Sequence, residues 1–436
     1  MQDRLTDEQI STAFQRALST PGLIDREEDT SVIFYDLTHL HDRVRGLKSL
    51  FPPDSLHAIA IKANPLEKVL TSIENLGVGL EAASLPELHI ALNAGYPPER
   101  IVFDSPAKTV KELDYALSVG VHVNADSLPE LERIDALLRN KASVSTVGVR
   151  INPQVGAGTI SKTSVAERGS KFGVPLERNR AQLKECFDRY SWLTGVHVHI
   201  GSQGCPVDLL LKGVRAVYDF ATEVNTDHQR RGTPNRVPVF DIGGGLPVSY
   251  ERGVRGPDMA AYVDELKKSC PDIFGPGCRL ITEFGRHVHA NAGWVASRVE
   301  YVKEGDGVDI AVIHVGADLF LRECYNPQDW HHEIAVVDAE GRLKQGTPES
   351  LYDIAGPLCF SGDLLARRIQ LPQIVAGDYI TIEDSGAYTS SMWSTYNSRQ
   401  FPKVVGYENG GKNLACLRQR QTVDEVLRFW SKGDLL

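Results

Sequence analysis

The stretch His57-Ala-Ile-Ala-Ile-Lys62-Ala-Asn-Pro65 decides the fold of this chain. Five uncharged residues that suit a β-strand lead into a single lysine, and Asn-Pro then ends the strand. A strand without polar alternation is typical of a parallel sheet that helices cover on both faces. Lys62 would then stand at the carboxyl end of such a strand, where barrel enzymes place their chemistry.

Lys62 is the candidate for chemistry in this stretch. A lysine that is removed from water gives up its proton more readily, so its neutral amine becomes available. A neutral amine forms a Schiff base with an aldehyde. The plain alternative is a lysine whose aliphatic stem is buried at a strand end while its charge stays in water.

Short apolar runs alternate with amphipathic stretches from about residue 40 to residue 286. Eight of the runs are expected to be strands: Ala58–Lys62, Gly79–Ala82, Ile101–Phe103, His122–Asn124, Thr146–Ile151, Gly195–Ile200, Pro238–Ile242 and Leu280–Glu283. Helix-like stretches separate most of them. Eight strands alternating with helices predict an α/β fold, a (β/α)8 barrel of the TIM type.

The sequence pattern changes after residue 290. Strand-like runs at 298–304, 307–315, 333–338, 378–383 and 403–407 are joined by turns rich in Gly, Pro and Asp. They predict a C-terminal all-β domain, and the strand-like run at 31–36 is expected to complete it. The predicted organisation is an N-terminal segment (1–41), a barrel (42–286) and a β domain (287–436).

The composition is that of an ordinary globular protein, with 42% hydrophobic and 24% charged residues. A net charge of −10 and the lack of a basic block argue against nucleic acid as a partner. No run reaches the ~20 apolar residues that a membrane helix needs, and the N-terminus has no apolar signal core. Seven cysteines without a CxxC pair suit a reducing cytoplasm.

Three consecutive glycines, Gly243, Gly244 and Gly245, follow a short apolar run. Without Cβ atoms, their backbone N–H groups can approach an anion closely, and a late barrel strand is where phosphate sites are common. The next predicted strand ends in Glu283-Phe-Gly-Arg286. Arg286 can pair with the same phosphate, and Glu283 can keep a pyridine nitrogen protonated. The alternatives are a tight loop and a surface ion pair.

Two histidines, His197 and His199, alternate within Gly-Val-His-Val-His-Ile-Gly. Alternation in a strand puts both on one face. A zinc site would need further ligands close by, so no metal is predicted. His199, nearer the strand end, is expected to stack on a flat ring, whereas His197 is expected to be a satisfied barrel residue.

The β region carries two more candidates. Cys359 lies in a Gly/Pro loop with Asp363 close by, where a thiol can be exposed enough to exchange a proton. Tyr388 follows a glycine turn, from which its hydroxyl can reach a phosphate. The alternatives are a buried structural thiol and a packed aromatic residue.

Together these motifs resemble the fold-III amino-acid decarboxylases that depend on pyridoxal 5'-phosphate. This family contains the diaminopimelate, ornithine and arginine decarboxylases and shares its barrel with alanine racemase. The matching pieces, in the family order, are AIKANP, SKFG (170–173), HVHIGSQ, DIGGG, EFGR, GPLCFSGD and GAYT. The resemblance extends over about residues 31–407 and is greatest to the diaminopimelate decarboxylases.

The resemblance implies a role for each matching residue. Lys62 would hold the cofactor as a Schiff base, His199 would stack on its ring, and Glu283 would contact the ring nitrogen. Arg150 and Glu87 match positions near the cofactor. The residues implied to line the phosphate site are Ser202, Gly243, Gly244, Gly245, Arg286 and Tyr388.

Members of this family have their active site at a dimer interface, so the resemblance implies a homodimer. Cys359 of the partner subunit would then donate the proton that replaces the departing carboxyl group. The implied reaction is α-decarboxylation of an amino acid, in which Glu283 keeps the cofactor ring cationic as an electron sink.

Two departures from the family pattern are visible. Phe284 replaces the usual proline of Glu-Pro-Gly-Arg, with little expected effect. Phe360 stands where diaminopimelate and ornithine decarboxylases usually carry an acidic residue for the distal ammonium of the substrate, and a ring binds a cation only weakly. Arg322 and Tyr325 fall where diaminopimelate decarboxylases bind the distal carboxylate, although their spacing is not the usual one.

The predicted substrate is therefore an amino acid with a distal carboxylate. The residues expected to contact it are Arg322, Tyr325, Phe360 and Asp363. Diaminopimelate fits this description, and so does a modified amino acid such as a citrylated one. The alternative enzyme is an amino-acid racemase that uses Lys62 and Cys359 on opposite faces of the ring, and the non-enzymatic alternative is a decarboxylase-like binding protein.

Overall fold

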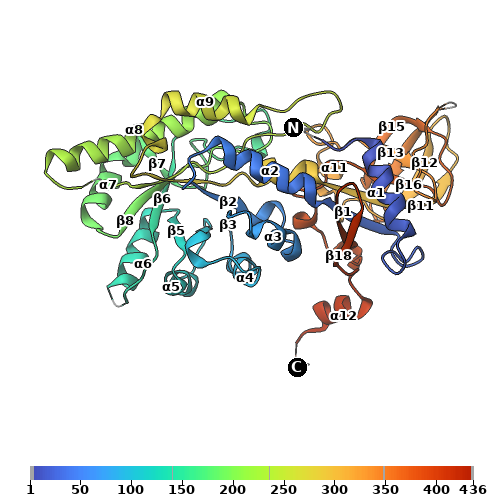
Figure 1. Cartoon of the computed structure of the whole chain (residues 1–436), viewed down its shortest axis with the longest axis horizontal. Helices are drawn as coiled ribbons and strands as arrows, with labels where there is room; N and C mark the ends of the chain where they lie inside the picture. The colour runs from blue at the N-terminus through green and yellow to red at the C-terminus, as the bar shows by residue number, and fades with distance from the viewer. Residues whose placement is uncertain (1–3, 140, 235, 347–348, 434–436) are drawn as a thin grey trace. The chain divides into compact units, whose positions relative to one another are not determined.

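The computed structural model describes residues 4–139, 141–234, 236–346 and 349–433. The chain divides into two compact units (Figure 1). One unit contains Arg43–Ser249 and Gly256–Val288. The other contains Met1–Asp42, Tyr250–Arg255 and His289–Leu436. Within the described ranges, every helix is too short or too polar to cross a membrane.

The larger unit is a closed barrel of parallel strands. In chain order these are β2 (Leu56–Ala60), β3 (Gly79–Ala82), β4 (Ile101–Asp104), β5 (His122–Ala125), β6 (Val147–Asn152), β8 (Leu193–His197), β9 (Val239–Asp241) and β10 (Arg279–Thr282). Neighbours follow the order β5-β4-β3-β2-β10-β9-β8-β6, and a β5–β6 pairing closes the ring. The short β7 (Val174–Pro175) pairs with β6. The predicted (β/α)8 barrel is confirmed.

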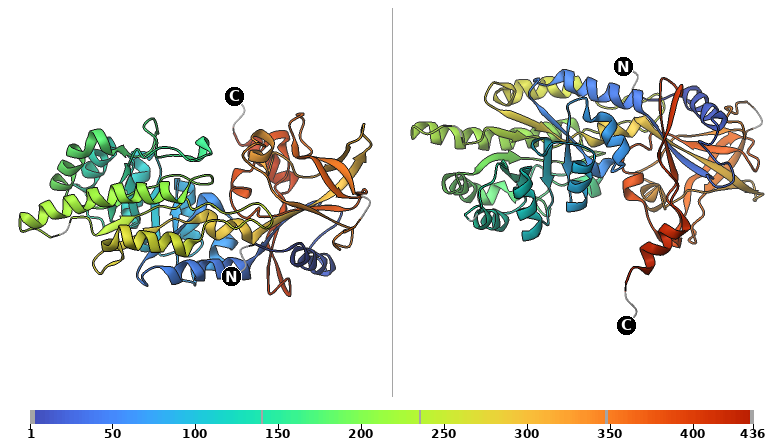
Figure 2. Two further views of the ribbon diagram at one scale, coloured as in Figure 1. Left: turned by 90° about the horizontal axis from the view of Figure 1, so that it is seen from above. Right: turned by 60° about the horizontal axis from the view of Figure 1, so that its bottom comes forward.

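Helices precede, connect and follow the barrel strands, and those labelled in Figure 1 lie outside the ring (Figures 1 and 2). They are α2 (Leu37–Leu50), α3 (Glu67–Glu74), α4 (Leu85–Asn93), α5 (Val110–Val119), α6 (Leu128–Leu138), α7 (Leu176–Arg189), α8 (Val207–Arg230), α9 (Met259–Ser269) and α10 (Gly285–His289). Ser84, Thr109 and Ser127 cap α4, α5 and α6 by accepting from the backbone N–H three residues on. These caps fix where the βα loops end.

One predicted strand stops short of its candidate residue. β2 ends at Ala60, and Lys62 lies in the 3-10 turn Ile61–Ala63 that follows. The turn closes because the Asn64 N–H donates to the Ile61 carbonyl at 2.8 Å. Pro65 restricts Asn64 to the extended backbone it adopts here, so the lysine leaves the barrel wall at the carboxyl end of the strand.

A second predicted strand is also shorter than expected. β8 ends at His197, so the prediction that one strand carries both histidines on one face is wrong for His199. The glycine loop packs against the next residues, because a Cβ on Gly243 would lie 2.5 Å from the Val198 carbonyl oxygen. His199 therefore belongs to the loop at the carboxyl end of the barrel.

The smaller unit contains a nine-stranded sheet. Its strands are β1 (Ser31–Asp36), β11 (Gly293–Lys303), β12 (Asp309–Ile313), β13 (Ile334–Val337), β14 (Glu349–Ala355), β15 (Leu364–Pro372), β16 (Tyr379–Ile382), β17 (Lys403–Glu408) and β18 (Asn413–Arg418). β1 pairs with β11 and β17, so the predicted completion of the β domain by an N-terminal strand is confirmed. This β-rich unit also contains α1 (Asp7–Ser19), α11 (Leu321–Tyr325) and α12 (Val423–Ser431).

Aromatic residues form the core of this unit. Phe34 on β1 and Trp294 on β11 stack with ring centroids 4.0 Å apart. Phe14 of α1 meets both rings edge-on, and the Trp294 Nε1–H donates to the Tyr407 hydroxyl at 3.0 Å. The N-terminal segment is therefore held to the C-terminal strands by buried aromatic surface.

Candidate active site

Lys62 meets a buried carboxylate at the mouth of the barrel. Its Nζ lies 2.5 Å from Oε2 of Glu81, a residue of β3 with no exposed surface. Burial raises the pKa of Glu81 to about 7, and the charge of Lys62 acts in the opposite direction. The lysine side chain itself is 35% exposed, so its amine reaches the opening of the barrel.

The three glycines form a loop so closely packed that a Cβ atom on any of them would clash with neighbouring backbone. Gly243 and Gly245 have φ of +63° and +101°, which favour glycine. A Cβ on Gly244 would lie 2.4 Å from the Glu283 carbonyl oxygen, and one on Gly245 would lie 2.1 Å from that of Gly201. Asp241 shapes the loop by accepting from the Gly243 N–H at 2.9 Å. This close approach of backbone is what an anion cradle requires.

Arg286 and Ser202 meet beside this loop. Nε and Nη2 of Arg286 both donate to the Ser202 hydroxyl at 3.3 Å. The arginine is only 4% exposed, and it starts from α10 because Gly285 fits closely against Ala60 and Ala63. The structure thus brings Ser202, Arg286 and the glycine loop together, as the sequence predicts for an anion site.

His199 is fixed by the same loop. Its Nδ1 accepts from the Gly244 N–H at 3.1 Å, so the proton of the neutral imidazole sits on Nε2. Burial holds the pKa of His199 well below its usual range. A neutral imidazole with a fixed ring plane is suited to stacking on a flat ring.

Glu283 lies at the end of β10 and is 3% exposed. Among the described residues, neither of its carboxyl oxygens has a hydrogen-bond partner. Burial, with Asp241 and Glu81 nearby, raises the pKa of Glu283 well above its usual range. A buried acid without a partner is costly, so this carboxyl group is poised to meet a polar atom from a ligand.

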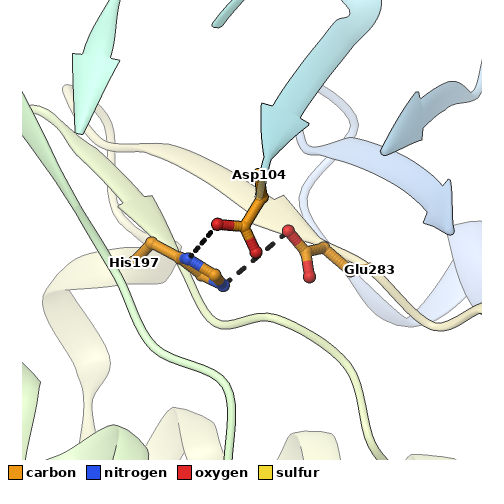
Figure 3. A group of neighbouring side chains, drawn as sticks. All are labelled: Asp104, His197 and Glu283. Carbon is orange, nitrogen blue, oxygen red and sulfur yellow. Dashed lines mark ion pairs between the residues drawn. The ribbon is translucent and has the colours of Figure 1, made fainter. Parts of the chain in front are cut away.

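Asp104, His197 and Glu283 form a buried cluster inside the barrel (Figure 3). His197 Nδ1 lies 3.6 Å from an Asp104 carboxylate oxygen, and its Nε2 lies 3.7 Å from one of Glu283. The spacing would allow a metal ion, but Arg150 Nη1 lies 3.2 Å from the other Asp104 oxygen. A guanidinium so close repels a divalent cation, so we assign no metal here.

Arg150 and Glu87 are placed near this cluster and near Lys62, respectively. The Arg150 guanidinium also lies over the Phe172 ring of the SKFG motif, 4.6 Å from its centroid. Glu87 accepts from the Ala83 N–H at 2.7 Å, which satisfies a free donor before α4. Burial raises the pKa of Glu87, and Lys62 is close enough to oppose that effect.

The remaining candidates belong to the β-rich unit. Arg322 lies between two rings, with its guanidinium carbon 4.5 Å from the centroid of Trp330 and 4.9 Å from that of Tyr388. Tyr388 has φ of +59°, an uncommon conformation for a tyrosine. Strained backbone of this kind is often found at functional sites.

Cys359 is exposed and lies among aromatic residues. Its N–H donates to Asn397 Oδ1 at 2.8 Å, and its carbonyl accepts from the Tyr396 hydroxyl at 3.3 Å. The neighbouring Phe360 stacks on Tyr325 with centroids 5.2 Å apart. The thiol therefore lies at the surface of its unit, beside a partly exposed aromatic cluster formed by Tyr325, Phe360 and Tyr396.

Asp363 has surroundings that differ from those expected of a substrate contact. It is 3% exposed, and its two oxygens accept from the Ala317 and Leu358 N–H groups, both at 2.6 Å. A Cβ on Gly316 would lie 2.1 Å from one of these oxygens. The carboxylate thus ties the loop at 316–317 to the loop that carries Cys359.

Sequence reasoning missed three buried acids of the barrel. Glu81 and Asp104 lie within apolar strands, where an acid gave no separate signal, and Asp126 follows another. Burial raises the pKa of Asp126 to about 6. The useful signal was an acid at the carboxyl end of each of three successive strands.

The described geometry fits pyridoxal 5'-phosphate. An amine, an unpartnered buried acid and a glycine cradle with an arginine lie at the carboxyl ends of barrel strands. The sequence pattern of the pyridoxal-binding domain of pyridoxal-dependent decarboxylases matches residues 37–290. The chain therefore belongs to the pyridoxal-dependent decarboxylase family, whose members are carboxy-lyases that use this cofactor.

Individual relatives agree with this assignment. Diaminopimelate decarboxylase of Zymomonas mobilis is 31% identical over 414 residues, which cover 93% of this chain and 94% of that protein. The crystal structure of diaminopimelate decarboxylase from Helicobacter pylori complexed with L-lysine matches with a TM-score of 0.81 at 27% identity, covering 94% of this chain and 98% of that one. The enzyme from M. jannaschii in co-complex with L-lysine gives 0.82 at 26%, covering 94% and 93%.

Proposed function

We propose that this protein removes the α-carboxyl group from an amino acid that carries a distal carboxylate, as a diaminopimelate decarboxylase does. The observation that carries the proposal is the meeting of Lys62, Glu283 and the Gly243–Gly245 loop at one end of the barrel. Pyridoxal 5'-phosphate, when bound, supplies the electron sink for the carbanion that decarboxylation leaves. The residues of the chain bind, orient and exchange protons around it.

Lys62 is proposed as the residue whose amine would hold the cofactor in the site. The amine must lose a proton before it can attack. Glu81, 2.5 Å away, is placed to receive that proton. Its pKa of about 7 makes it able to take and return a proton near neutral pH.

Glu283, His199 and Arg286 are proposed to orient the ring. Glu283 would face the ring nitrogen and keep it protonated. The ring N–H would then be a hydrogen-bond donor to a carboxyl oxygen that has no partner among the described residues. His199 would stack on one ring face. Arg286, Ser202 and the glycine loop would bind the phosphate with N–H and hydroxyl groups, and we assign Tyr388 to the same phosphate.

A second copy of the chain is proposed to complete the site. Cys359 of the partner subunit would protonate the substrate carbon after carbon dioxide leaves, and the exposure of this thiol supports the proposal. The apolar residues of α12 fit a homodimer as well. Val423, Leu427 and Trp430 are 61%, 58% and 59% exposed, on a helix that extends beyond the strands of its unit (Figures 1 and 2).

The charges of α12 favour packing of this helix against the same helix of a second copy of the chain. Acidic Asp424 and Glu425 lie in the first turn and Arg428 in the last. Two such helices packed antiparallel around a two-fold axis would place unlike charges opposite each other. Replacing Leu427 and Trp430 with Asp is expected to weaken the dimer in sedimentation experiments, and an unchanged mass would contradict this role of α12.

The distal carboxylate is assigned to Arg322. Its flanking rings, Trp330 and Tyr388, hold the guanidinium in one orientation, which favours a bidentate pair with a carboxylate. The stacked Phe360 and Tyr325 offer no charge to a distal ammonium. This observation favours a second candidate substrate, a modified amino acid whose distal amine is absent or acylated.

The cysteine chemistry fits a reducing compartment. All seven cysteines are free thiols, so we propose a cytoplasmic location.

The proposal is tested by loading the protein with pyridoxal 5'-phosphate and recording its visible absorption and carbon dioxide release. A Lys62→Ala variant is expected to lose the absorption of the covalent form and the activity. Loss of the configuration at the α-carbon of the amino acid, without carbon dioxide release, would instead indicate a racemase. A Lys62→Ala variant that keeps the covalent band would contradict the role of Lys62.

A further inference from the structure

The imidazole ring of His197 has no hydrogen-bond partner among the described residues, although it lies fully inside the barrel. Each of its ring nitrogens faces a carboxyl group instead. Nδ1 lies 3.6 Å from Asp104, and Nε2 lies 3.7 Å from Glu283 (Figure 3). Both distances exceed the usual length of a hydrogen bond by less than an ångström. Contacts of this kind in active sites often shorten only when a ligand is bound.

The three members of the cluster differ in what else holds them. Asp104 is paired with the permanent positive charge of Arg150 at 3.2 Å, which stabilises its carboxylate form. Within the part of the chain that the structure describes, Glu283 has no such cation within hydrogen-bonding distance, and its second oxygen lies 3.9 Å from His199 Nδ1. His197 therefore stands between a fixed anion and an acid whose charge depends on the ligand.

We infer that His197 is a positioning residue that becomes doubly protonated when the cofactor binds, and that it then pins Glu283 against the ring nitrogen. It would donate from Nε2 to Glu283 and from Nδ1 to Asp104. This inference rests on the proposed function, because it needs a pyridine nitrogen opposite Glu283.

The protons balance as follows. In the free chain, burial favours a protonated Glu283 and a singly protonated His197 ring. On binding, Glu283 gives its proton to the ring nitrogen and becomes a carboxylate. His197 then has a carboxylate on each side and takes one proton from solvent, so the complex of protein and cofactor gains one proton for each cofactor bound.

The electrostatics of the free chain agree with this starting state. Burial lowers the pKa of His197, and Asp104 and Asp241 oppose that effect. A new negative charge on Glu283 adds to the same opposition, since an adjacent anion favours the charged imidazole. The other titratable or charged groups around the cluster, among the described residues, are Lys62, Glu81, Lys108, His122, Asp126, Arg150, His199 and Asp241.

The test counts protons. Cofactor-free protein is titrated with pyridoxal 5'-phosphate in a calorimeter, in two buffers of different ionisation enthalpy, which gives the protons taken up per cofactor. His197→Gln, which cannot ionise, is expected to take up about one proton fewer than the wild type. Proton changes at Lys62 and at the phosphate are common to both proteins and cancel in the difference. An equal uptake in the two proteins would overturn the inference.

His57 supplies the matched control. It is also a buried barrel histidine, 2% exposed, but its Nδ1 pairs with Thr282 at 2.9 Å, outside the cluster. His57→Gln should therefore keep the wild-type proton uptake. If His197→Gln does not fold, Asp104→Asn removes one of the two flanking charges and is expected to reduce the uptake in the same direction, whereas unchanged uptake there contradicts the inference.

A second readout separates positioning from simple packing. With ¹⁵N-labelled cofactor, the ring nitrogen is expected to be protonated in the wild type and to lose that proton at a lower pH in His197→Gln. Decarboxylation should fall roughly 10- to 100-fold, the range expected for losing one hydrogen bond to a charged group. If no cofactor binds covalently to any of these proteins, the proposed function fails, which is a different result from equal proton uptake.

Discussion

Lys62 Nζ lies 2.5 Å from Oε2 of Glu81, and the two residues come from the ends of adjacent barrel strands. The acid is fully buried while the lysine reaches the opening. This pair makes the free enzyme sensitive to pH, because the pKa of Glu81 is raised by burial from 4.5 to about 7.

The first prediction concerns the stability of cofactor-free Glu81→Gln. Folded Glu81 binds its proton more tightly than the unfolded chain does, so its contribution to stability is present below pH 4.5 and is lost as the pH rises through about 7. Relative to wild type, the free energy of unfolding of Glu81→Gln should therefore increase by roughly 1–3 kcal/mol between pH 5 and pH 8. Urea unfolding at both values measures this, and a difference that does not change with pH would contradict it.

The glycine cradle gives a second prediction. Gly245→Ala would place a Cβ 2.1 Å from the Gly201 carbonyl oxygen, at φ of +101°, so the loop must move away from the proposed phosphate site. Affinity for pyridoxal 5'-phosphate should fall at least tenfold, as expected from a loss of ~1.4 kcal/mol or more. Gly277→Ala is the control, because it has a similar φ of +94° but open space around it. Equal affinities in the two variants would argue against the cradle.

Asp363 gives a third prediction. Asp363→Ala leaves the Ala317 and Leu358 N–H groups buried without an acceptor, which costs about 1–3 kcal/mol for each. The variant should therefore unfold at lower denaturant concentration, whereas exposed Asp306→Ala should not. A variant of normal stability with a raised KM would instead make Asp363 a substrate contact.

Phe360 gives a prediction about specificity. Phe360→Glu would add a charge beside the ring of Tyr325 and should raise kcat/KM for a substrate with a free distal ammonium. Arg322→Ala should lower kcat/KM for substrates with a distal carboxylate, roughly 10- to 100-fold for a charged hydrogen bond. The substrate assignment fails if Arg322→Ala leaves every substrate unaffected.

The proposal that two subunits share each active site gives a prediction for mixed dimers. Lys62→Ala and Cys359→Ala should each be inactive alone, because each removes one group from every site. After unfolding and refolding together, half of the dimers are mixed and each has one intact site, so roughly a quarter of the wild-type activity should return. No recovery, with mixed dimers shown by mass, would place Cys359 outside the partner's site.

The sequence predicted the barrel well because buried strands have short apolar runs with clear ends. The run at 31–36 matches β1, and 79–82 matches β3. β14, β15 and β18 were not predicted, because they mix polar with apolar residues without regular alternation. Such strands are held by pairing with their neighbours, which a local pattern does not reveal.

The sequence singled out candidate site residues where a motif points to one kind of chemistry, but it did not reveal the long-range contacts that those residues make. Lys62, Glu283 and the glycines stood out by type and position. The partner of Lys62 did not, because Glu81 is set 19 residues away on the next strand. The role of Asp363 depends on Ala317, 46 residues earlier, and no local signal links the two.

The measurement that tests the central claim most directly is carbon dioxide release by the cofactor-loaded protein from a panel of amino acids. The panel holds meso-diaminopimelate, L- and D-lysine, ornithine, arginine and a citryl-amino acid. We predict release from a substrate with a distal carboxylate and none from lysine, ornithine or arginine. Release from those three alone, or from none while the cofactor is bound at Lys62, would contradict the account.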